Sequence, residues 1–273
     1  MSSLKRALRD ILFRLAPEKM TSFMSARARK HSQRLVKEWG LVDLNHRLLK
    51  EVGNSVVSGP FRGLRLTSMT WQEHIGPYLL GTYEQEIHAW WNDIFKRRFD
   101  LIIDVGAKFG YYAFGLALRF PSAHVVAFDT DRWARKAMRE MALANNVHSV
   151  SIKGFCTAQW LNQNVKSNTL IMSDCEGFEG QLFSEVDLDR MASSTLIIEL
   201  HEGLVPGVTA RIEQRFMKTH DTEKVTSRSK PFPTELQIRS LTKEEMDRAS
   251  AEIRPEQQWL RLSPKIDRMR RTP

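Results

Sequence analysis

The sequence of 273 residues is long enough for one large α/β domain, or for one domain with a substantial appendage. Hydrophobic residues make up 42% of the chain, which suffices for a packed core and argues against global disorder. The two cysteines are too few for a disulfide scaffold or a cysteine-based zinc site, and no apolar run reaches the roughly 20 residues that span a bilayer.

The positive charge lies at the two ends of the chain. The formal net charge is +9, and residues 1–50 hold twelve Lys and Arg against four acidic residues. The last thirteen residues hold five basic residues against one acidic residue. The stretch between them therefore carries a small negative charge, as is usual for the body of an enzyme. Because the basic ends contain no recognisable nucleic-acid-binding module, we do not expect nucleic acid as the partner.

The first 56 residues are predicted to form a basic helical extension. Apolar residues between Leu4 and Leu15 recur on one helical face, and Pro17 is expected to end that helix. A second basic helix is expected over residues 21–39. The extension either packs on the body with its charged face in water, or contacts anionic lipid or an acidic partner. Because the start lacks the long apolar stretch of a secretory signal, we expect a cytoplasmic protein, with peripheral contact at the inner face of the membrane as the alternative.

Residues 57–273 are predicted to form one α/β domain. A short strand is expected at 61–68 and a helix at 87–98. Apolar runs that are typical of strands then alternate with helical stretches: strands at 101–105, 124–128, 149–152, 169–172 and 195–200, and helices at 111–120, 131–146, 156–165 and 179–192. A helix ending near 217–220, strands near 223–228 and 258–263, and a helix at 242–253 follow. Continuous apolar runs indicate strands that are buried on both faces, so we expect a doubly wound, mostly parallel sheet.

The turn after the first of these parallel strands has the composition of a nucleotide-cofactor cradle. Asp104 ends the strand, Gly106 permits a tight turn, and Gly110 opens a helix whose N-terminus favours negative charge. The dinucleotide fingerprint needs a second glycine two positions after Gly106, where this chain has Lys108. Asp129 ends the neighbouring strand, and its two oxygens can accept hydrogen bonds from both ribose hydroxyls. Together these residues favour a nucleoside with a small charged tail, and S-adenosylmethionine has that shape.

Several segments resemble those of class I S-adenosylmethionine-dependent methyltransferases, and more narrowly of the FkbM-type methyltransferases. The matching stretches are GTYE at 81–84, DVGAKFGYYA at 104–113, DCEGFEGQLF at 174–183 and IIELHE at 197–202. The resemblance covers roughly residues 76–220 and leaves both ends of the chain uncovered. It implies a Rossmann-like class I methyltransferase sheet, to which the helical extension predicted from the residues would be added on the N-terminal side.

The resemblance also implies roles for individual residues. The methionine part of the cofactor would be surrounded by Asp104, Gly106 and Gly110, and the ribose would contact Asp129. Further contacts would come from Tyr83 and Glu84, which would close over the cofactor, and from Phe155 and Cys156, which would line the adenine. Lys108 stands where the family commonly has Asn, which alters the contacts to the methionyl part. For each position the alternative is a structural role, as a turn glycine, a capping acid or a core aromatic.

Acidic residues and one histidine follow the next two strands. Asp174 and Glu176 come after the strand at 169–172, and Glu199 and His201 lie at the end of the strand at 195–200. Residues two apart on an extended chain point the same way, so we expect Asp174, Glu176 and His201 to act together as catalytic residues that position or deprotonate a hydroxyl. No dedicated metal-ligand spacing occurs, so no metal is expected. The alternatives are a divalent cation held by Asp174, Glu176 and Glu199, or structural roles in capping a helix and anchoring a loop.

The expected function is therefore methyl transfer from S-adenosylmethionine, with a small-molecule or glycan-type hydroxyl as the acceptor. The resemblance alone favours oxygen as the acceptor atom, on a sugar, a glycolipid or a secondary metabolite. The alternatives are a nicotinamide-dependent oxidoreductase on a Rossmann-type sheet and a non-catalytic, methyltransferase-like binding module. The missing glycine at position 108 argues against the first alternative, and the presence of Lys108 favours the second.

Overall fold

The computed structural model describes residues 11–13, 15–227, 238–254 and 256–265. Its centre is a seven-stranded sheet with the strand order β3-β2-β1-β4-β5-β7-β6. The strands are β1 (Leu101–Val105), β2 (His124–Phe128), β3 (Val150–Lys153), β4 (Thr169–Ser173), β5 (Thr195–Leu200), β6 (His220–Thr226) and β7 (Gln258–Pro264). Strands β1 to β5 pair in parallel, whereas β7 runs antiparallel to both β5 and β6. The predicted doubly wound, mostly parallel sheet is confirmed.

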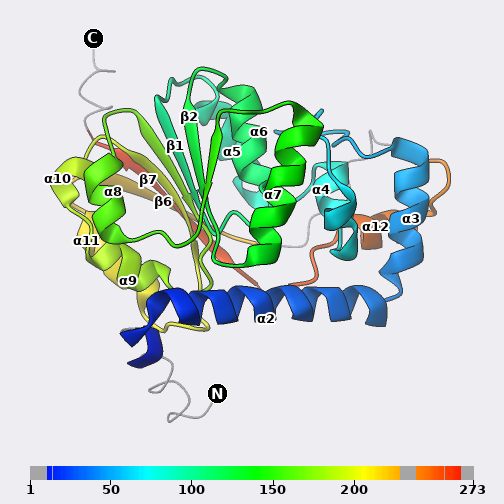
Figure 1. Ribbon diagram of the computed structural model, residues 1–273, viewed down its shortest axis with the longest axis horizontal. Helices are drawn as coiled ribbons and strands as arrows, with labels where there is room; N and C mark the ends of the chain where they lie inside the picture. Colours follow the sequence, from blue (N-terminus) through cyan, green and yellow to red (C-terminus); the bar gives the residue numbers. More distant parts are fainter. Residues whose placement is uncertain (1–10, 14, 228–237, 255, 266–273) are drawn as a thin grey trace.

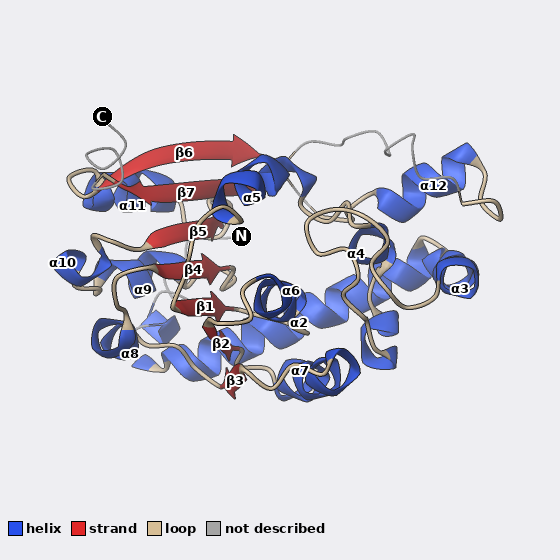
Figure 2. Cartoon of the chain, turned by 90° about the horizontal axis from the view of Figure 1, so that it is seen from above, coloured by secondary structure: helices blue, strands red, loops and turns tan. Residues whose placement is uncertain are grey.

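Helices cover both faces of the sheet (Figures 1 and 2). One face carries α5 (His88–Ile94), α6 (Tyr111–Arg119) and α7 (Arg132–Asn145). The other carries α8 (Ala158–Asn164), α9 (Glu179–Ser184), α10 (Leu188–Met191) and α11 (Val208–Phe216). In three-layer α/β folds of this kind, ligands bind at the carboxyl ends of the parallel strands, and we call this edge of the sheet the crevice.

The alternation of side chains along the buried strands creates two separate hydrophobic cores. All five residues of β1 are buried. Ile102 belongs to the core under α5, α6 and α7, whereas Leu101 and Ile103 belong to the core under α8, α9 and α11. Successive side chains of a strand point to opposite faces, so a strand covered on both sides has to be apolar throughout. This requirement explains the continuous apolar runs in the sequence.

 The N-terminal part consists of α2 (Pro17–Glu38) and α3 (Leu41–Val52). The buried leucines of α3 join the core under α5, α6 and α7. Pro17 occupies the first turn of α2, where its missing N–H costs no hydrogen bond, so it begins this helix as well as ending the one before it. The predicted earlier helix falls mostly on residues 1–10, outside the described part of the chain. Whether residue 56 is a domain boundary stays a prediction.

Helix α2 runs along the edge of the sheet at which the parallel strands end (Figure 1). The Arg29 guanidinium lies 2.8 Å from the Asp131 carboxylate, just beyond the end of β2. At the other side of the crevice, the ring of Phe13 stacks on Phe178 with 6.0 Å between centroids. The helix therefore covers the edge where the sequence predicts the cofactor.

The remaining elements connect the extension to the sheet. They include α4 (Gly76–Leu80), the 3-10 helices η1 (Ser68–Gln72) and η2 (Gln85–Ile87), and α12 (Lys243–Ser250), which begins with the predicted capping box at Thr242. The strand predicted at 61–68 is wrong, because this stretch forms only an isolated bridge between Ser55 and Arg65. Its apolar side chains pack into the core from an irregular backbone.

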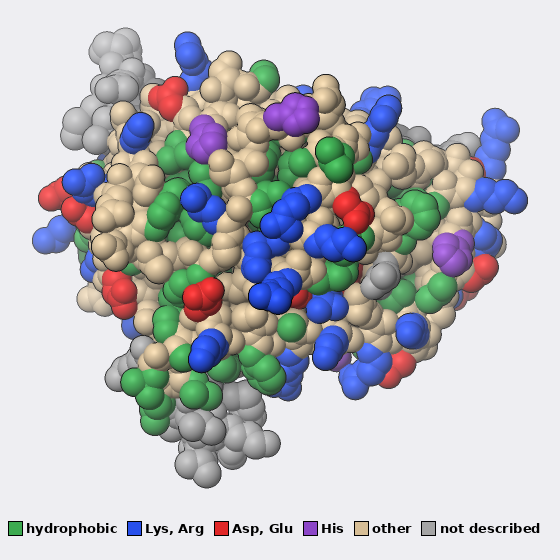
Figure 3. Space-filling model, viewed as in Figure 1, with side chains coloured by type: hydrophobic (Ala, Val, Ile, Leu, Met, Phe, Trp, Pro, Cys, Tyr) green, Lys and Arg blue, Asp and Glu red, His purple; other side chains and the backbone are tan. Residues whose placement is uncertain are grey.

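The surface shows where the basic residues gather. Lys and Arg side chains lie over α7 and along α2 (Figure 3). Among the helices of the described residues, none is both long enough and apolar enough to cross a membrane.

Candidate active site

The turn after β1 requires a glycine at position 106. Gly106 has a φ of +85°, and a Cβ added to it would lie 1.6 Å from the carbonyl oxygen of Asp174. The N–H groups of Gly106 and Ala107 both donate to the carbonyl oxygen of Phe128 at 2.9 Å. The turn is thus clamped between the ends of β2 and β4. Gly110 is also in the left-handed region, with a φ of +91°, directly before α6.

Asp129 is fixed in the crevice by two backbone donors. Its Oδ1 accepts from the N–H of Asp131 at 2.7 Å, and its Oδ2 accepts from the N–H of Lys108 at 2.8 Å. Each carboxylate oxygen has a second lone pair, so two acceptor positions remain for a ligand. Burial raises the pKa of Asp129 to about 7, although both N–H donors oppose this shift. The side chain is therefore held ready to accept two further hydrogen bonds.

Asp104 has a buried oxygen without a hydrogen-bond partner. The residue is 3% exposed, and its Oδ2 accepts no hydrogen bond from the part of the chain that the structure describes. Burial raises the pKa of Asp104 to about 8; the backbone N–H of Ala113 opposes this shift, and the carboxylates of Asp174 and Asp129 add to it. A buried polar atom without a partner is costly, so a cationic donor at this oxygen would be strongly favoured.

Lys108 contributes its backbone to the cradle and directs its side chain elsewhere. Its φ is +50°, and its Nζ lies 3.2 Å from the Oε2 of Glu73. Glu73 is fully buried, and the Lys108 ammonium also lies over the rings of Tyr78 and Phe109. Burial lowers the pKa of Lys108, but the Glu73 carboxylate outweighs this and the net shift is upward. The lysine therefore neutralises a buried acid that the sequence motifs did not reveal.

Tyr83 and Glu84 lie in a buried network ahead of β1. The Tyr112 hydroxyl donates to Glu84, and the Arg254 guanidinium lies 3.3 Å from the other carboxylate oxygen of Glu84. Burial raises the pKa of Glu84 to about 8 although Arg254 lowers it. The Tyr83 ring stacks on Tyr78 with 4.0 Å between centroids. The structure thus holds both predicted residues rigidly at the rim of the crevice.

Arg254 was not predicted, although it connects four acidic residues. Its guanidinium forms ion pairs with Glu84, Glu86, Glu199 and Glu252 at distances of 2.8 to 3.3 Å. Arg254 follows α12 and lies 170 residues from Glu84 in the chain, so no local spacing connects them. Its contact with Glu199 at 2.9 Å gives that residue an ion-pair partner, which argues against Glu199 as a ligand in the alternative metal site.

Phe155, one of the two predicted adenine-lining residues, lies next to Phe178. The ring of Phe155 is 5.2 Å from that of Phe178, which in turn stacks on Phe13. Cys156 is a buried free thiol, and burial raises its pKa. Both residues follow β3, and their contact with a cofactor stays a prediction.

Asp174, Glu176 and His201 converge as predicted. One ligand-type atom of each lies within 4.8 Å of the others. The Nε2 of His201 is 3.6 Å from the Oδ1 of Asp174 and 3.8 Å from the Oε2 of Glu176. The expected extended chain is wrong here, because Glu176 has a φ of +54° in a turn. The turn, and not the alternation of a strand, brings the two carboxylates to the imidazole.

Glu179 fixes the orientation of His201. One Glu179 oxygen accepts from the backbone N–H of His201 at 2.8 Å and lies 3.2 Å from its Nδ1. The other oxygen accepts from the N–H of Gly177 at 2.9 Å. Glu179 therefore ties the turn after β4 to the end of β5, and it directs the Nε2 of His201 toward Asp174 and Glu176.

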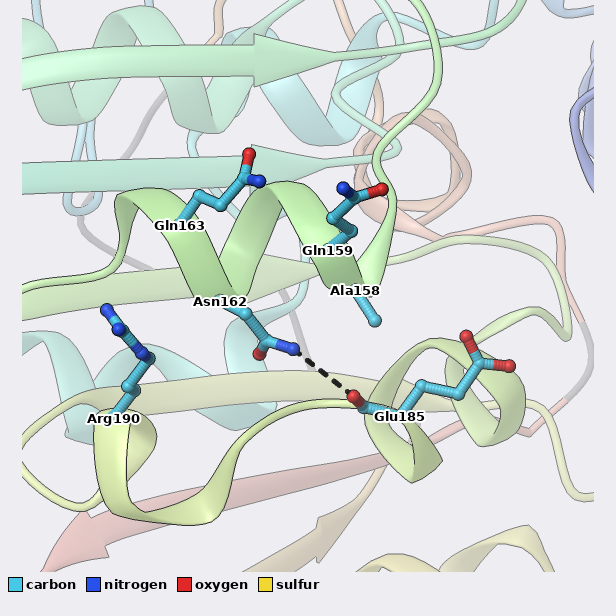
Figure 4. A pocket seen from close by; sticks show the side chains of 6 residues that line it. All are labelled: Ala158, Gln159, Asn162, Gln163, Glu185 and Arg190. Atoms are coloured by element: carbon cyan, nitrogen blue, oxygen red, sulfur yellow. Dashed lines mark hydrogen bonds between the residues drawn. The ribbon is translucent and has the colours of Figure 1, made fainter.

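A separate polar pocket lies on the surface at α8 and α10 (Figure 4). Its lining residues are Ala158, Gln159, Asn162, Gln163, Glu185 and Arg190. The amide of Asn162 donates to the carbonyl oxygen of Glu185 across this pocket at 3.3 Å. None of the predicted site residues lines it.

Comparisons with known proteins give structural matches only. No protein-family model matches the sequence, and no curated protein matches it. The chain is similar to a precorrin-6Y C5,15-methyltransferase from Geobacter metallireducens, with 11% identity, a TM-score of 0.44 and coverage of 63% of this chain and 85% of that chain.

Two O-methyltransferase structures are similar to the same extent. One is from Bacillus cereus in complex with S-adenosylhomocysteine, with 11% identity, a TM-score of 0.42 and coverage of 61% of this chain and 74% of that chain. The other is from Streptomyces achromogenes, is involved in tomaymycin synthesis and is in complex with S-adenosylmethionine, with 12% identity, a TM-score of 0.41 and coverage of 63% and 76%. At identities this low, the chemistry of this chain has to follow from its own side chains.

Proposed function

We propose that this protein transfers a methyl group from S-adenosylmethionine to a hydroxyl group of a small-molecule or glycan-type acceptor. The observation that carries the proposal is the pair of acids at the ends of the neighbouring strands β1 and β2. Asp104 offers a buried oxygen without a partner, and Asp129 is oriented by two backbone N–H groups. The parallel register of the two strands places both acids at the same end of the sheet.

The cradle suits the charged tail and the ribose of this cofactor. The Oδ2 of Asp104 would accept a hydrogen bond from the methionine ammonium, which would supply its missing partner. The free lone pairs of Asp129 would accept from the two ribose hydroxyls. Tyr83 and Glu84 would limit the pocket on the side of α4, and Phe155 would contact the adenine. The FkbM-type resemblance of residues 76–220 supports this assignment.

Asp174, Glu176 and His201 would act on the acceptor. When bound, S-adenosylmethionine supplies an electrophilic methyl group, so the acceptor oxygen bonds to the methyl carbon as the bond from that carbon to sulfur breaks, and a neutral thioether is left. The hydroxyl proton would pass to one of the two carboxylates and then to water. The main task of the protein is to align the hydroxyl with the methyl group, and the fixed position of His201 serves that task.

Thermal unfolding with added ligands tests the proposal. S-adenosylhomocysteine at about 100 times its Kd should stabilise the protein by about 2.7 kcal/mol, and NAD should not. Asp129→Ala should lose most of this response, whereas Asp189→Asn, on the exposed side of α10, should keep it. Stabilisation by NAD alone would show that the site belongs to an oxidoreductase. Cofactor binding without turnover of any acceptor would favour a non-catalytic binding module.

A further inference from the structure

We propose that Asp174, Glu176 and His201 form a binding site for a divalent cation of the Mn²⁺ or Zn²⁺ type. The three side chains come from the turn after β4 and from the end of β5, so they lie at the edge of the sheet that faces the crevice. Their ligand-type atoms lie within 4.8 Å of one another, a spacing that a single ion can bridge. The set differs from the alternative considered from the sequence, because His201 takes the place of Glu199.

The surroundings of the His201 imidazole indicate a bound ligand. His201 is 6% exposed, and its Nδ1 side is occupied by Glu179 at 3.2 Å. Its Nε2 faces Asp174 and Glu176 at distances too long for hydrogen bonds. The Oδ1 of Asp174 is itself buried and has no hydrogen-bond partner among the described residues. The Oδ1 of Asp174 and the Nε2 of His201 thus face each other across 3.6 Å, which is too long for a hydrogen bond and leaves room for a bridging ion.

Glu179 holds the His201 ring in the way that a carboxylate holds a metal-bound histidine. Metal-bound histidines commonly hold a carboxylate on the ring nitrogen that does not bind the metal, and this contact fixes the ring orientation. The contact between Glu179 and the Nδ1 of His201 has this form and leaves Nε2 as the ligand atom. Glu179 is fully buried, so its position is set by packing as well as by hydrogen bonds.

The local charge also favours a cation. Three carboxylates surround one imidazole, so an excess of negative charge remains even when the ring is protonated. The positive charge of Lys108 opposes the upward shift in the pKa of Glu176, but the Lys108 ammonium is already paired with Glu73. A divalent ion bound to neutral His201 would balance this charge better than a proton does. Two carboxylates with one imidazole suit Mn²⁺ and Zn²⁺, whereas Mg²⁺ prefers oxygen ligands alone.

The catalytic role of the ion rests on the proposed methyl transfer, but its binding does not. An acceptor hydroxyl bound to the cation would lose its proton more readily, because the positive charge stabilises the alkoxide. The O–H bond would break, with the proton passing to a carboxylate oxygen that does not hold the ion. The alkoxide oxygen would then bond to the methyl carbon as the carbon–sulfur bond breaks.

Titration of the metal-free protein with Mn²⁺ alone, followed by electron paramagnetic resonance, tests the site. We expect one bound Mn²⁺ per chain, displaced by Zn²⁺. Asp174→Asn and Glu176→Gln should each weaken binding at least tenfold, and both residues are partly exposed, so these variants should fold. Glu179→Gln should weaken binding by about 10- to 100-fold through the orientation of His201. Glu185→Gln, an exposed carboxylate in the polar pocket at α8 and α10, is the control and should bind as the unmodified protein does.

Three outcomes would overturn the inference. They are the absence of stoichiometric Mn²⁺ binding, equal binding by Asp174→Asn, and loss of binding in Glu199→Gln to the same degree as in Glu176→Gln. Stabilisation by S-adenosylhomocysteine in the presence of a chelator is measured on the same samples. A protein that binds S-adenosylhomocysteine but no Mn²⁺ contradicts this inference alone. A protein that binds Mn²⁺ but not S-adenosylhomocysteine contradicts the proposed function alone.

Discussion

The backbone and the side chain of Lys108 have different roles in the site. Its N–H donates to Asp129, and this contact needs only a residue that tolerates a positive φ. Its side chain is 40% exposed, and its ammonium pairs with the fully buried Glu73. Lys108 is thus compatible with the cradle, because its ammonium lies over Tyr78 and Phe109.

Lys108→Asn should lower stability without abolishing cofactor binding. Asparagine tolerates a positive φ, so the backbone donor to Asp129 should remain, but Glu73 would be left buried without a cation. An unpaired buried polar group costs about 1–3 kcal/mol of unfolding free energy, which urea denaturation measures. Adding Glu73→Gln to Lys108→Asn should recover most of that loss. A double variant no more stable than Lys108→Asn alone would show that the ion pair is not the cause.

Asp104 should make the stability of the unliganded protein depend on pH. Its pKa of about 8 in the folded protein lies above the ordinary value of 3.8, because of burial and of the facing carboxylates of Asp174 and Asp129. The folded state therefore binds the proton more tightly than the unfolded state does, and stability falls as pH rises between about 4 and 8. The steepest contribution of one such group is about 1.4 kcal/mol per pH unit.

Asp104→Asn should remove this contribution. Urea denaturation at pH 5, 7 and 9 should show the variant gaining stability relative to the unmodified protein as pH rises. A stability difference between the two proteins that stays constant over this range would contradict the assignment. The same variant should lose the response to S-adenosylhomocysteine, because the acceptor for the ammonium is gone.

At the residue scale, the sequence predicts the positions of side chains that directly follow strands. It does not predict contacts from residues that are distant in the sequence. Asp104, Asp129, Asp174 and His201 each end or follow an apolar run, so their place at one edge of the sheet could be predicted. Arg254 reaches Glu84 and Glu199 only through the packing of α12 on α4, and no local pattern indicates this contact.

At the scale of elements, α2 is the feature with the clearest functional consequence. It crosses the edge of the sheet that holds Asp129, and its ion pair between Arg29 and Asp131 joins it to the segment directly after β2. The Arg29 guanidinium also lies 5.1 Å from the ring of Trp133. Opening of this helix would expose the predicted adenosine site, so the stability of these contacts should influence ligand exchange.

Arg29→Gln should loosen α2 over the crevice. A partly buried ion pair is worth about 1 kcal/mol, so we expect several-fold faster amide hydrogen exchange in residues 17–38 and faster release of S-adenosylhomocysteine. Arg34→Gln changes the same charge on the exposed side of α2 and serves as the matched control. Equal exchange rates in the two variants would show that α2 does not act as a cover.

Element prediction succeeded where the chain is periodic and failed where it is irregular. The apolar runs and the capping box at Thr242 identify strands and a helix because each pattern has one main structural explanation. The stretch at 61–68 alternates like a strand, yet its neighbours offer only the bridge between Ser55 and Arg65. A strand needs a partner, and the partner is determined by tertiary packing.

At the scale of the whole molecule, we propose from the basic surface of α2 that the protein makes peripheral contact with anionic lipid. Arg27, Lys30, Arg34 and Lys37 are exposed and recur every three or four residues, which places them on one side of the helix. Phe23 and Trp39 are exposed at the two ends of this stripe. Basic side chains flanked by exposed aromatic residues suit the surface of an anionic membrane.

Replacing Lys30, Arg34 and Lys37 by Gln together should weaken binding to phosphatidylserine vesicles at least tenfold, because each basic residue contributes about 1 kcal/mol near such a surface. Replacing the exposed Arg132, Lys136 and Arg139 of α7 by Gln makes the same charge change over α7 and is the control. Sedimentation with vesicles at two salt concentrations measures the binding. Equal weakening by both triple variants would indicate general charge attraction and not contact through α2.

The central claim is that S-adenosylmethionine binds where β1 and β2 end, and a crystal structure of the protein grown with S-adenosylhomocysteine tests it most directly. We expect the ribose hydroxyls on the carboxylate of Asp129, the ammonium on Asp104, and the sulfur facing Asp174 and His201. A ligand bound elsewhere, or an adenosine whose ribose does not contact Asp129, would contradict the account.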